Sequence, residues 1–119
     1  MQFTTLDGSA INDDTWLIEV GTALDNSNAL EMLNAIRLAH ETGHHRIIID
    51  MKKLEFLSSA GVGSILGSIE EIREHDGDII LCNLSPQIRH VFEVLDLADF
   101  FTMTDGREQA CTAELTQRS

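Results

Sequence analysis

The chain has 119 residues and carries 20 acidic against 8 basic side chains, which gives a formal net charge of −12. Its hydrophobic share of 43% is typical of a folded globular protein and exceeds what a disordered acidic tail contains. A surface this negative repels phosphate backbones and anionic lipids, so we expect neither a nucleic-acid partner nor a membrane partner.

The first half of the chain predicts short strands around one helix. We expect strands at Phe3–Leu6 and Trp16–Val20, separated by an acidic turn. Asn28 is a favourable N-cap residue for a helix. Apolar residues at helical spacing follow it, namely Ala29, Met32, Leu33 and Ile36. Gly43 ends this helix, and residues 46–51 then have the apolar centre of a buried parallel strand.

The second half repeats the alternation. One amphipathic helix is expected from the spacing of Val62, Ile65, Leu66, Ile69 and Ile72, and Gly77 ends it. Residues 78–82 form the next buried strand. Ser85 and Pro86 are the N-cap and first residue of a helix whose inward residues are Ile88, Val91, Phe92 and Leu95. A last short strand at Phe100–Met103 and a closing helix over about Arg107–Thr116 complete the pattern.

This alternation predicts an α/β fold, with residues 1–119 as a single domain. We expect a mixed β-sheet of about four to five strands covered by about four helices. The two cysteines, Cys82 and Cys111, have no metal-ligand spacing, and the N-terminus lacks a signal peptide pattern. No apolar run approaches the ~20 residues of a membrane span, so we expect a cytoplasmic protein.

Three short patterns suggest other chemistry but lack its structural context. The run His40–His44 matches the H-E-x-x-H zinc-protease motif, yet Gly43 interrupts the helix that would carry both histidines. The glycines of 61–67 do not follow a strand directly, as a dinucleotide fingerprint would, and favour close backbone packing instead. Asp50 follows a buried strand like a receiver phosphoacceptor, but no lysine occurs after Lys53. We therefore expect no metal, no cofactor and no enzyme activity.

The most informative segment covers residues 50–63. A buried strand leads into a polar turn, an apolar pair, and then Ser58 and Ser59 at the start of a glycine-rich helix. Taken alone, this pattern favours a serine that caps the helix.

The segment as a whole resembles the STAS-domain anti-sigma factor antagonists of bacteria. That family has an aspartate, a hydrophobic turn, an aromatic-aliphatic pair, a serine-containing step and Gly-x-Gly, as here at 50–63. Gly21 with residues 25–29 is similar to the family's loop before its first helix. Residues 83–89 resemble its later strand-to-helix junction, which continues through 91–95.

The resemblance implies a site on this chain. It places the phosphoacceptor at Ser59, with Ser58 at a position where many members have aspartate. It implies partner-binding residues on the same surface, namely Asp25, Asn28, Ser58, Ser59, Ala60, Gly61 and Gly63.

The resemblance also implies a function without catalysis. The unphosphorylated chain would bind an anti-sigma factor that is also an ATP-dependent serine kinase, and so release a sigma factor. Phosphorylation at Ser59 would break that complex, and a metal-dependent serine phosphatase would restore it. The alternative is a STAS scaffold or transporter-associated subunit that is not phosphorylated, in which Ser59 is only a helix cap.

Overall fold

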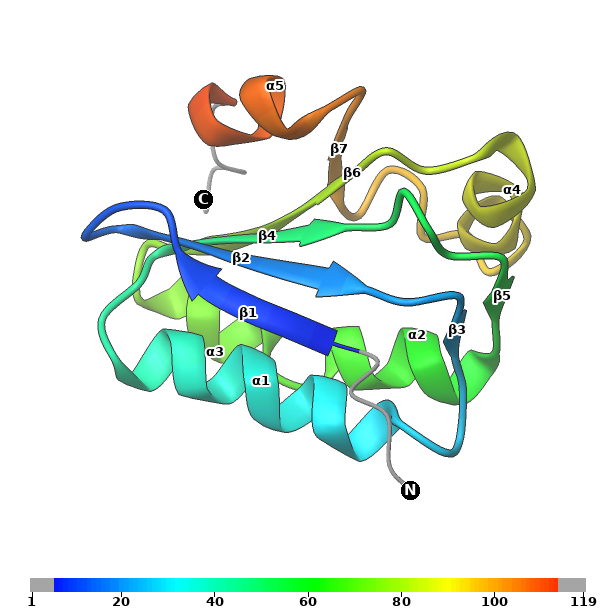
Figure 1. Ribbon diagram of the computed structural model, residues 1–119, viewed down its shortest axis with the longest axis horizontal. Helices are drawn as coiled ribbons and strands as arrows, with labels where there is room; N and C mark the ends of the chain where they lie inside the picture. Colours follow the sequence, from blue (N-terminus) through cyan, green and yellow to red (C-terminus); the bar gives the residue numbers. More distant parts are fainter. Residues whose placement is uncertain (1–5, 114–119) are drawn as a thin grey trace.

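The computed structural model describes residues 6–113, which form a five-stranded mixed sheet with helices on both faces (Figure 1). The strands lie in the order β1 (Leu6–Ala10), β2 (Thr15–Val20), β4 (Arg46–Asp50), β6 (Asp78–Cys82) and β7 (Thr102–Thr104). Only β1 is antiparallel to its neighbour, and the other pairs are parallel. The predicted α/β class and sheet size are confirmed.

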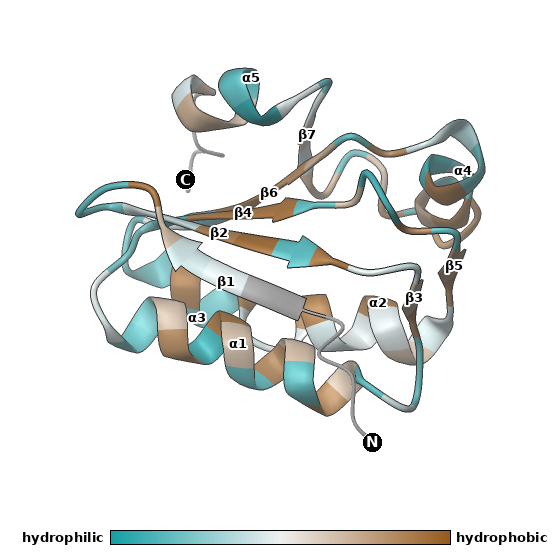
Figure 2. Cartoon of the chain, in the orientation of Figure 1, coloured by the Kyte–Doolittle hydropathy of each residue, from teal (hydrophilic) through white to brown (hydrophobic). Residues whose placement is uncertain are grey.

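Each central strand buries both of its faces. Ile47 and Ile49 of β4 belong to the main core, whereas Ile48 between them belongs to a smaller cluster on the opposite face. This alternation explains why these strands have continuous apolar sequences, which appear as brown ribbons in Figure 2.

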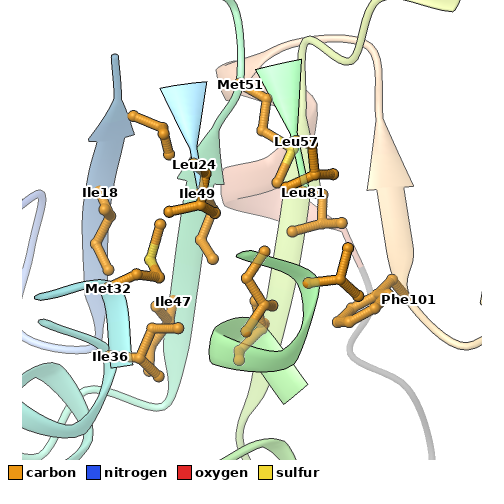
Figure 3. Close-up of a cluster of buried hydrophobic side chains, with 14 of the residues drawn as sticks. Ile18, Leu24, Met32, Ile36, Ile47, Ile49, Met51, Leu57, Leu81 and Phe101 are labelled. Atoms are coloured by element: carbon orange, nitrogen blue, oxygen red, sulfur yellow. The ribbon is translucent and has the colours of Figure 1, made fainter. Parts of the chain in front are cut away.

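Most helices cover one face of the sheet. The helices α1 (Ala29–Glu41), α2 (Ser59–Leu66) and α3 (Ile69–Glu74) lie together on that face in Figure 1. Met32 and Ile36 of α1 are fully buried there, beside isoleucines of β2 and β4 (Figure 3). The opposite face carries α5 (Arg107–Thr112), while α4 (Pro86–Val94) packs beside the short strand β5 (Phe56–Leu57).

The prediction of one continuous helix over 62–72 is wrong. The structure has α2 and α3 instead, and the chain leaves helical geometry at Ser68, where φ is −123° and ψ is 5°. A Cβ on the preceding Gly67 would lie 2.8 Å from Leu33 Cδ1 of α1, so a larger residue here would require the Leu33 side chain to move. The apolar residues of both short helices pack into the same hydrophobic core, and for that reason the apolar spacing continues across the break.

Several boundaries also differ from the sequence prediction. Most of the strand expected at 3–6 lies outside the described residues, and β1 continues to Ala10 because it pairs along the length of β2. The strand β4 ends at Asp50, one residue earlier than expected. The strand β7 begins two residues later than expected. The closing helix stops at Thr112, and residues 114–119 lie outside the described part.

Leu95 does not point inward as predicted. It is 42% exposed because α4 ends at Val94 and the chain then turns through Asp96, whose φ is 62°. The predicted inward positions Ile88 and Phe92 are confirmed, since both are almost fully buried.

Candidate functional site

The two adjacent serines occupy different positions at the start of α2. Ser58 is the N-cap: its backbone is extended, and its Oγ accepts a hydrogen bond from the Gly61 N–H at 3.2 Å. Ser59 is the first residue of α2 and its side chain is exposed. Within the part of the chain that the structure describes, no hydrogen bond involves the Ser59 hydroxyl. The capping role therefore belongs to Ser58, and Ser59 presents an accessible hydroxyl.

The small residues after Ser59 divide into exposed and buried positions. Ala60 is half-buried and Gly63 faces open space. Gly61 is buried, and a Cβ at this position would lie 2.5 Å from the Leu24 carbonyl oxygen. The close backbone approach expected of these glycines is confirmed at Gly61, which lets α2 pack against the strand that precedes α1.

A two-stranded ribbon brings the loop before α1 beside these serines. The strand β3 (Ala23–Leu24) pairs in parallel with β5, and the Ser58 N–H donates to the Leu24 carbonyl at 3.0 Å. Neither strand was predicted, because two residues are too few to show an alternating pattern.

The side chain of Asp25 is ordered by its own loop. Its Oδ1 accepts hydrogen bonds from the Ser27 hydroxyl at 2.6 Å and from the Ser27 N–H at 2.9 Å. These two bonds, the hydroxyl first, hold the pKa of Asp25 below its usual value. Asp25 is therefore a fixed negative charge on this surface at neutral pH.

Asn28 occupies the predicted N-cap position but does not cap α1 through its side chain. Its Oδ1 accepts from the Asp25 N–H, and its Nδ2 donates to the Ala23 carbonyl, both at 2.9 Å. Asn28 is 6% exposed, so its side chain braces the loop from within. The predicted N-cap position of Asn28 is confirmed, but its side-chain amide bonds to the loop and not to the first turn of α1.

These elements together line a shallow groove of about 370 Å³. The lining residues are Asp25, Asn26, Ser27, Phe56 and Ser58. Phe56 was not singled out from the sequence, although its ring is 56% exposed at the edge of the groove. An aromatic residue two positions before the serine pair was the available signal.

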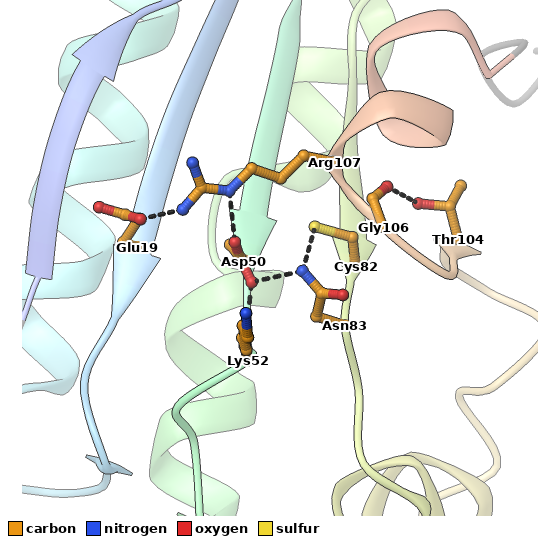
Figure 4. A network of polar contacts seen from close by, with 8 residues as sticks. All are labelled: Glu19, Asp50, Lys52, Cys82, Asn83, Thr104, Gly106 and Arg107. Atoms are coloured by element: carbon orange, nitrogen blue, oxygen red, sulfur yellow. Dashed lines mark hydrogen bonds and ion pairs between the residues drawn. The ribbon is translucent and has the colours of Figure 1, made fainter.

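A second polar cluster lies at the carboxyl ends of the strands (Figure 4). Asp50 Oδ1 accepts from the Lys52 N–H at 2.9 Å and from Asn83 Nδ2 at 3.0 Å. Asp50 Oδ2 accepts from Arg107 Nε at 2.5 Å, and the Arg107 guanidinium also pairs with Glu19. The sequence suggested Asp50 only as a receiver-type phosphoacceptor, whereas its carboxylate is 4% exposed and fully engaged.

The cluster fixes the charge states of its members. Burial alone would raise the pKa of the Asp50 carboxyl, but the bonds from Arg107, Asn83 and the Lys52 N–H, with the Arg107 charge, outweigh it and lower that pKa. Burial, followed by the Asp50 charge, raises the pKa of the nearby Cys82 thiol to about 12. Asp50 is therefore ionised at neutral pH, and Cys82 stays a protonated, unreactive thiol.

The histidines of the zinc-protease motif have separate surroundings. His40 lies near the end of α1, with its Nε2 3.8 Å from Glu71 Oε2. His44 lies beyond the helix, with its ring against Trp16 and its Nδ1 3.2 Å from the Ala39 carbonyl. Among residues 6–113, no group of three or more His, Cys, Asp or Glu side chains is arranged to hold a metal ion. No helix in the same range is long and apolar enough to cross a membrane.

Comparisons with known proteins identify relatives of this chain. A sequence model of the STAS domain matches residues 9–110. The chain is 33% identical over 101 residues to BtrV of Bordetella bronchiseptica, a candidate anti-sigma factor antagonist, covering 84% of this chain and 87% of that protein.

Solved structures of the anti-sigma factor antagonist SpoIIAA also match. The unphosphorylated form superposes with a TM-score of 0.77 at 29% identity, covering 89% of this chain and 91% of that one. The phosphorylated form from Bacillus gives a TM-score of 0.71 at 28% identity, covering 89% of this chain and 95% of that one. With a family match across most of its length and relatives named as anti-sigma factor antagonists, the chain belongs to the STAS domain family.

Proposed function

We propose that this protein is an anti-sigma factor antagonist that phosphorylation of Ser59 switches off. The observation that carries the proposal is the contrast between the two serines: Ser58 caps α2, while Ser59 offers an exposed hydroxyl that has no hydrogen bond within residues 6–113. The SpoIIAA relative, known in unphosphorylated and phosphorylated forms, supports a phosphorylation switch.

Charge explains how one phosphate would control binding. The segment 57–63 has no charged side chain, so a partner can close on it without desolvating an ion. A phosphate adds about −1.5 to −2 charges and three strong acceptors at its centre. An interface shaped around a neutral hydroxyl would then have to bury a dianion, which is costly unless a cation compensates it.

The fold itself tolerates a phosphate at this position. Ser59 is the first residue of α2, an eight-residue helix. The helix dipole favours negative charge at that end, and Ser58 still provides the cap. Phosphorylation would therefore change the interface and leave the domain folded.

The proposed contact surface has two parts. Asp25, Ser58, Ser59, Ala60 and Gly63 have side chains or backbone at the surface and would touch the partner. The two remaining predicted contact residues, Asn28 and Gly61, are buried. We propose that they act by holding the loop and α2 in place.

The partners follow from this switch. An anti-sigma factor with ATP-dependent serine kinase activity would bind the unphosphorylated surface, release its sigma factor and phosphorylate Ser59. A metal-dependent serine phosphatase would reverse the modification. The protein itself would act by binding and not by catalysis.

Phosphosite mapping tests this proposal. The purified protein is incubated with ATP and the anti-sigma factor kinase of the same organism, then analysed by intact-mass and peptide mass spectrometry. We expect one phosphate on Ser59, its loss in Ser59→Ala, and its retention in Ser58→Ala. Stable binding of the kinase without any phosphate transfer would contradict the switch and favour a scaffold function.

A further inference from the structure

The carboxylate of Asp50 accepts hydrogen bonds from two connecting segments, which leave the sheet at the same end. One is the segment 51–58, which carries the Lys52 N–H bound to Asp50 and ends at Ser58. The other begins at Asn83, whose φ of 60° turns the chain toward α4 and whose Nδ2 donates to the same Asp50 oxygen. One buried carboxylate therefore fixes the start of both connections.

The same two connections meet again beside the proposed contact surface. Gln87 of α4 donates through Nε2 to the Glu55 carbonyl at 3.5 Å. Glu55 and Phe56 are also held by the Thr22 carbonyl, at 2.8 and 3.1 Å from their N–H groups. The segment that ends at Ser58 is thus tied at Asp50 and again at its far end.

Arg107 supplies the positive charge that this junction requires. Asp50 is 4% exposed, and a carboxylate this buried is stable as an ion only when it is paired and hydrogen-bonded. Arg107 reaches it from α5, on the other face of the sheet (Figures 1 and 4). Without that cation, the carboxylate would have to take up a proton or move toward water, and either change weakens the hydrogen bond from the Lys52 N–H.

The helix that carries Arg107 depends on few contacts. It has six residues, and its N-cap Gly106 has no side chain to cap it. Ala110 packs in the cluster on that face of the sheet, and Arg46 Nη1 donates to the Ala110 and Ala113 carbonyls at 2.9 and 2.7 Å. Arg46 therefore anchors the far end of α5 without touching Asp50.

We propose that Arg107 is a positioning residue for the Ser59 surface. Through Asp50, it fixes the segment 51–58 in the conformation that presents Phe56 and Ser58 beside Ser59. The claim that Arg107 holds the segment 51–58 in place follows from the hydrogen bonds described above. The claim that this affects recognition by a kinase rests on the proposed function. A partner or solvent condition that displaces α5 would accordingly alter a surface on the opposite side of the sheet.

Amide hydrogen exchange with a matched pair of variants tests this proposal. Arg107→Met removes the cation from Asp50, while Arg37→Met removes an exposed arginine of α1, a helix on the other face of the sheet from α5. We expect exchange of the Lys52 amide to accelerate about tenfold in Arg107→Met, the effect of weakening one charge-assisted hydrogen bond. Arg37→Met should change it less than about twofold, and Arg107→Lys should restore part of the protection.

Phosphorylation kinetics supply the functional measurement. With the anti-sigma factor kinase and ATP, Arg107→Met should raise KM for the protein about tenfold and leave kcat nearly unchanged, because Ser59 itself is intact. Glu19→Gln, which removes the negative charge of the exposed second partner of Arg107 and leaves the bond to Asp50, should give a smaller effect, and Arg107→Lys keeps the test available if Arg107→Met fails to fold.

The exchange and phosphorylation measurements test two separate claims, the positioning role of Arg107 and the proposed function. Equal exchange of the Lys52 amide in Arg107→Met and Arg37→Met, or in Arg107→Lys and wild type where Arg107→Met does not fold, would overturn the positioning role. A wild-type protein that receives no phosphate would overturn the proposed function, while the exchange comparison would still decide the role of Arg107.

Discussion

At the scale of single residues, Ser58 and Ser59 differ in what the fold requires of them. Ser58→Ala removes the N-cap of α2 and should lower the free energy of unfolding by about 1 kcal/mol. Ser59→Ala removes an exposed hydroxyl that makes no hydrogen bond to any described residue, and it should change the free energy of unfolding by less than about 0.5 kcal/mol. Urea denaturation of both variants measures the difference. A Ser59→Ala variant as destabilised as Ser58→Ala would show that Ser59 has a structural role.

Two glycines of α2 provide a second residue-scale comparison. Gly61→Ala places a Cβ 2.5 Å from the Leu24 carbonyl oxygen, so α2 or β3 must shift. We expect a loss of about 1–3 kcal/mol in stability. Gly63→Ala meets nothing within 4 Å and should stabilise the helix by up to about 1 kcal/mol. Thermal unfolding of the two variants should give shifts of opposite sign, and equal shifts would contradict the close packing at Gly61.

At the scale of elements, a buried ion pair joins α3 to the sheet. Arg73 Nε donates to Asp78 Oδ1 at 2.9 Å, with side-chain exposures of 8% and 0%. The same guanidinium donates to the Phe100 carbonyl and stacks on the Phe100 ring, 4.4 Å from its centroid. Arg73→Met leaves Asp78 as a buried charge without this cation and should cost about 3–5 kcal/mol.

Arg37→Met on the exposed face of α1 is the control for that loss. It should change stability by less than about 0.5 kcal/mol, because its side chain lies at the surface. Chemical denaturation measures both variants. Similar stabilities for the Arg73 and Arg37 variants would mean that α3 is held by apolar contacts alone.

The elements also show how far the sequence could predict the fold. The apolar strands at 46–50 and 78–82 and the helix after Ser85–Pro86 were predictable, because burial and capping leave local patterns. The pairing of β3 with β5 depends on contacts between distant residues, such as Ala23 with Phe56, and the apolar spacing runs through the break at Ser68 without marking it. The sequence of the segment 57–63 was enough to single out the serine pair. Only the structure shows that Ser58 caps α2 and that Ser59 has the exposed hydroxyl. The cluster of Asp50 with Arg107 joins residues 57 positions apart, and no local pattern predicts it.

At the scale of the whole molecule, the net charge is −12, whereas the segment 57–63 contains no charged side chain. The many acidic side chains lie mostly on solvated surface, where salt screens them. A phosphate on Ser59 would instead fall at the centre of the proposed contact surface. One added group can therefore control binding although the protein already carries a large negative charge.

The pH dependence of folding provides a test at this scale. The pKa of Asp50 is lowered in the folded protein, so its contribution to stability is present above the unfolded value of about 3.9 and is lost as pH falls through the folded value. Wild type should be more stable than Asp50→Asn at pH 7, and the gap should narrow below about pH 4. Thermal unfolding between pH 7 and pH 2.5 measures it. A gap that stays constant would contradict the ionised Asp50.

The central claim is that Ser59 phosphorylation switches partner binding, and calorimetric titration of the anti-sigma factor kinase with both forms of the protein tests it most directly. The account predicts that the phosphorylated form binds at least about a hundredfold more weakly, or about 3 kcal/mol, while its melting temperature stays close to that of the unphosphorylated form. Equal affinity of the two forms would contradict the account.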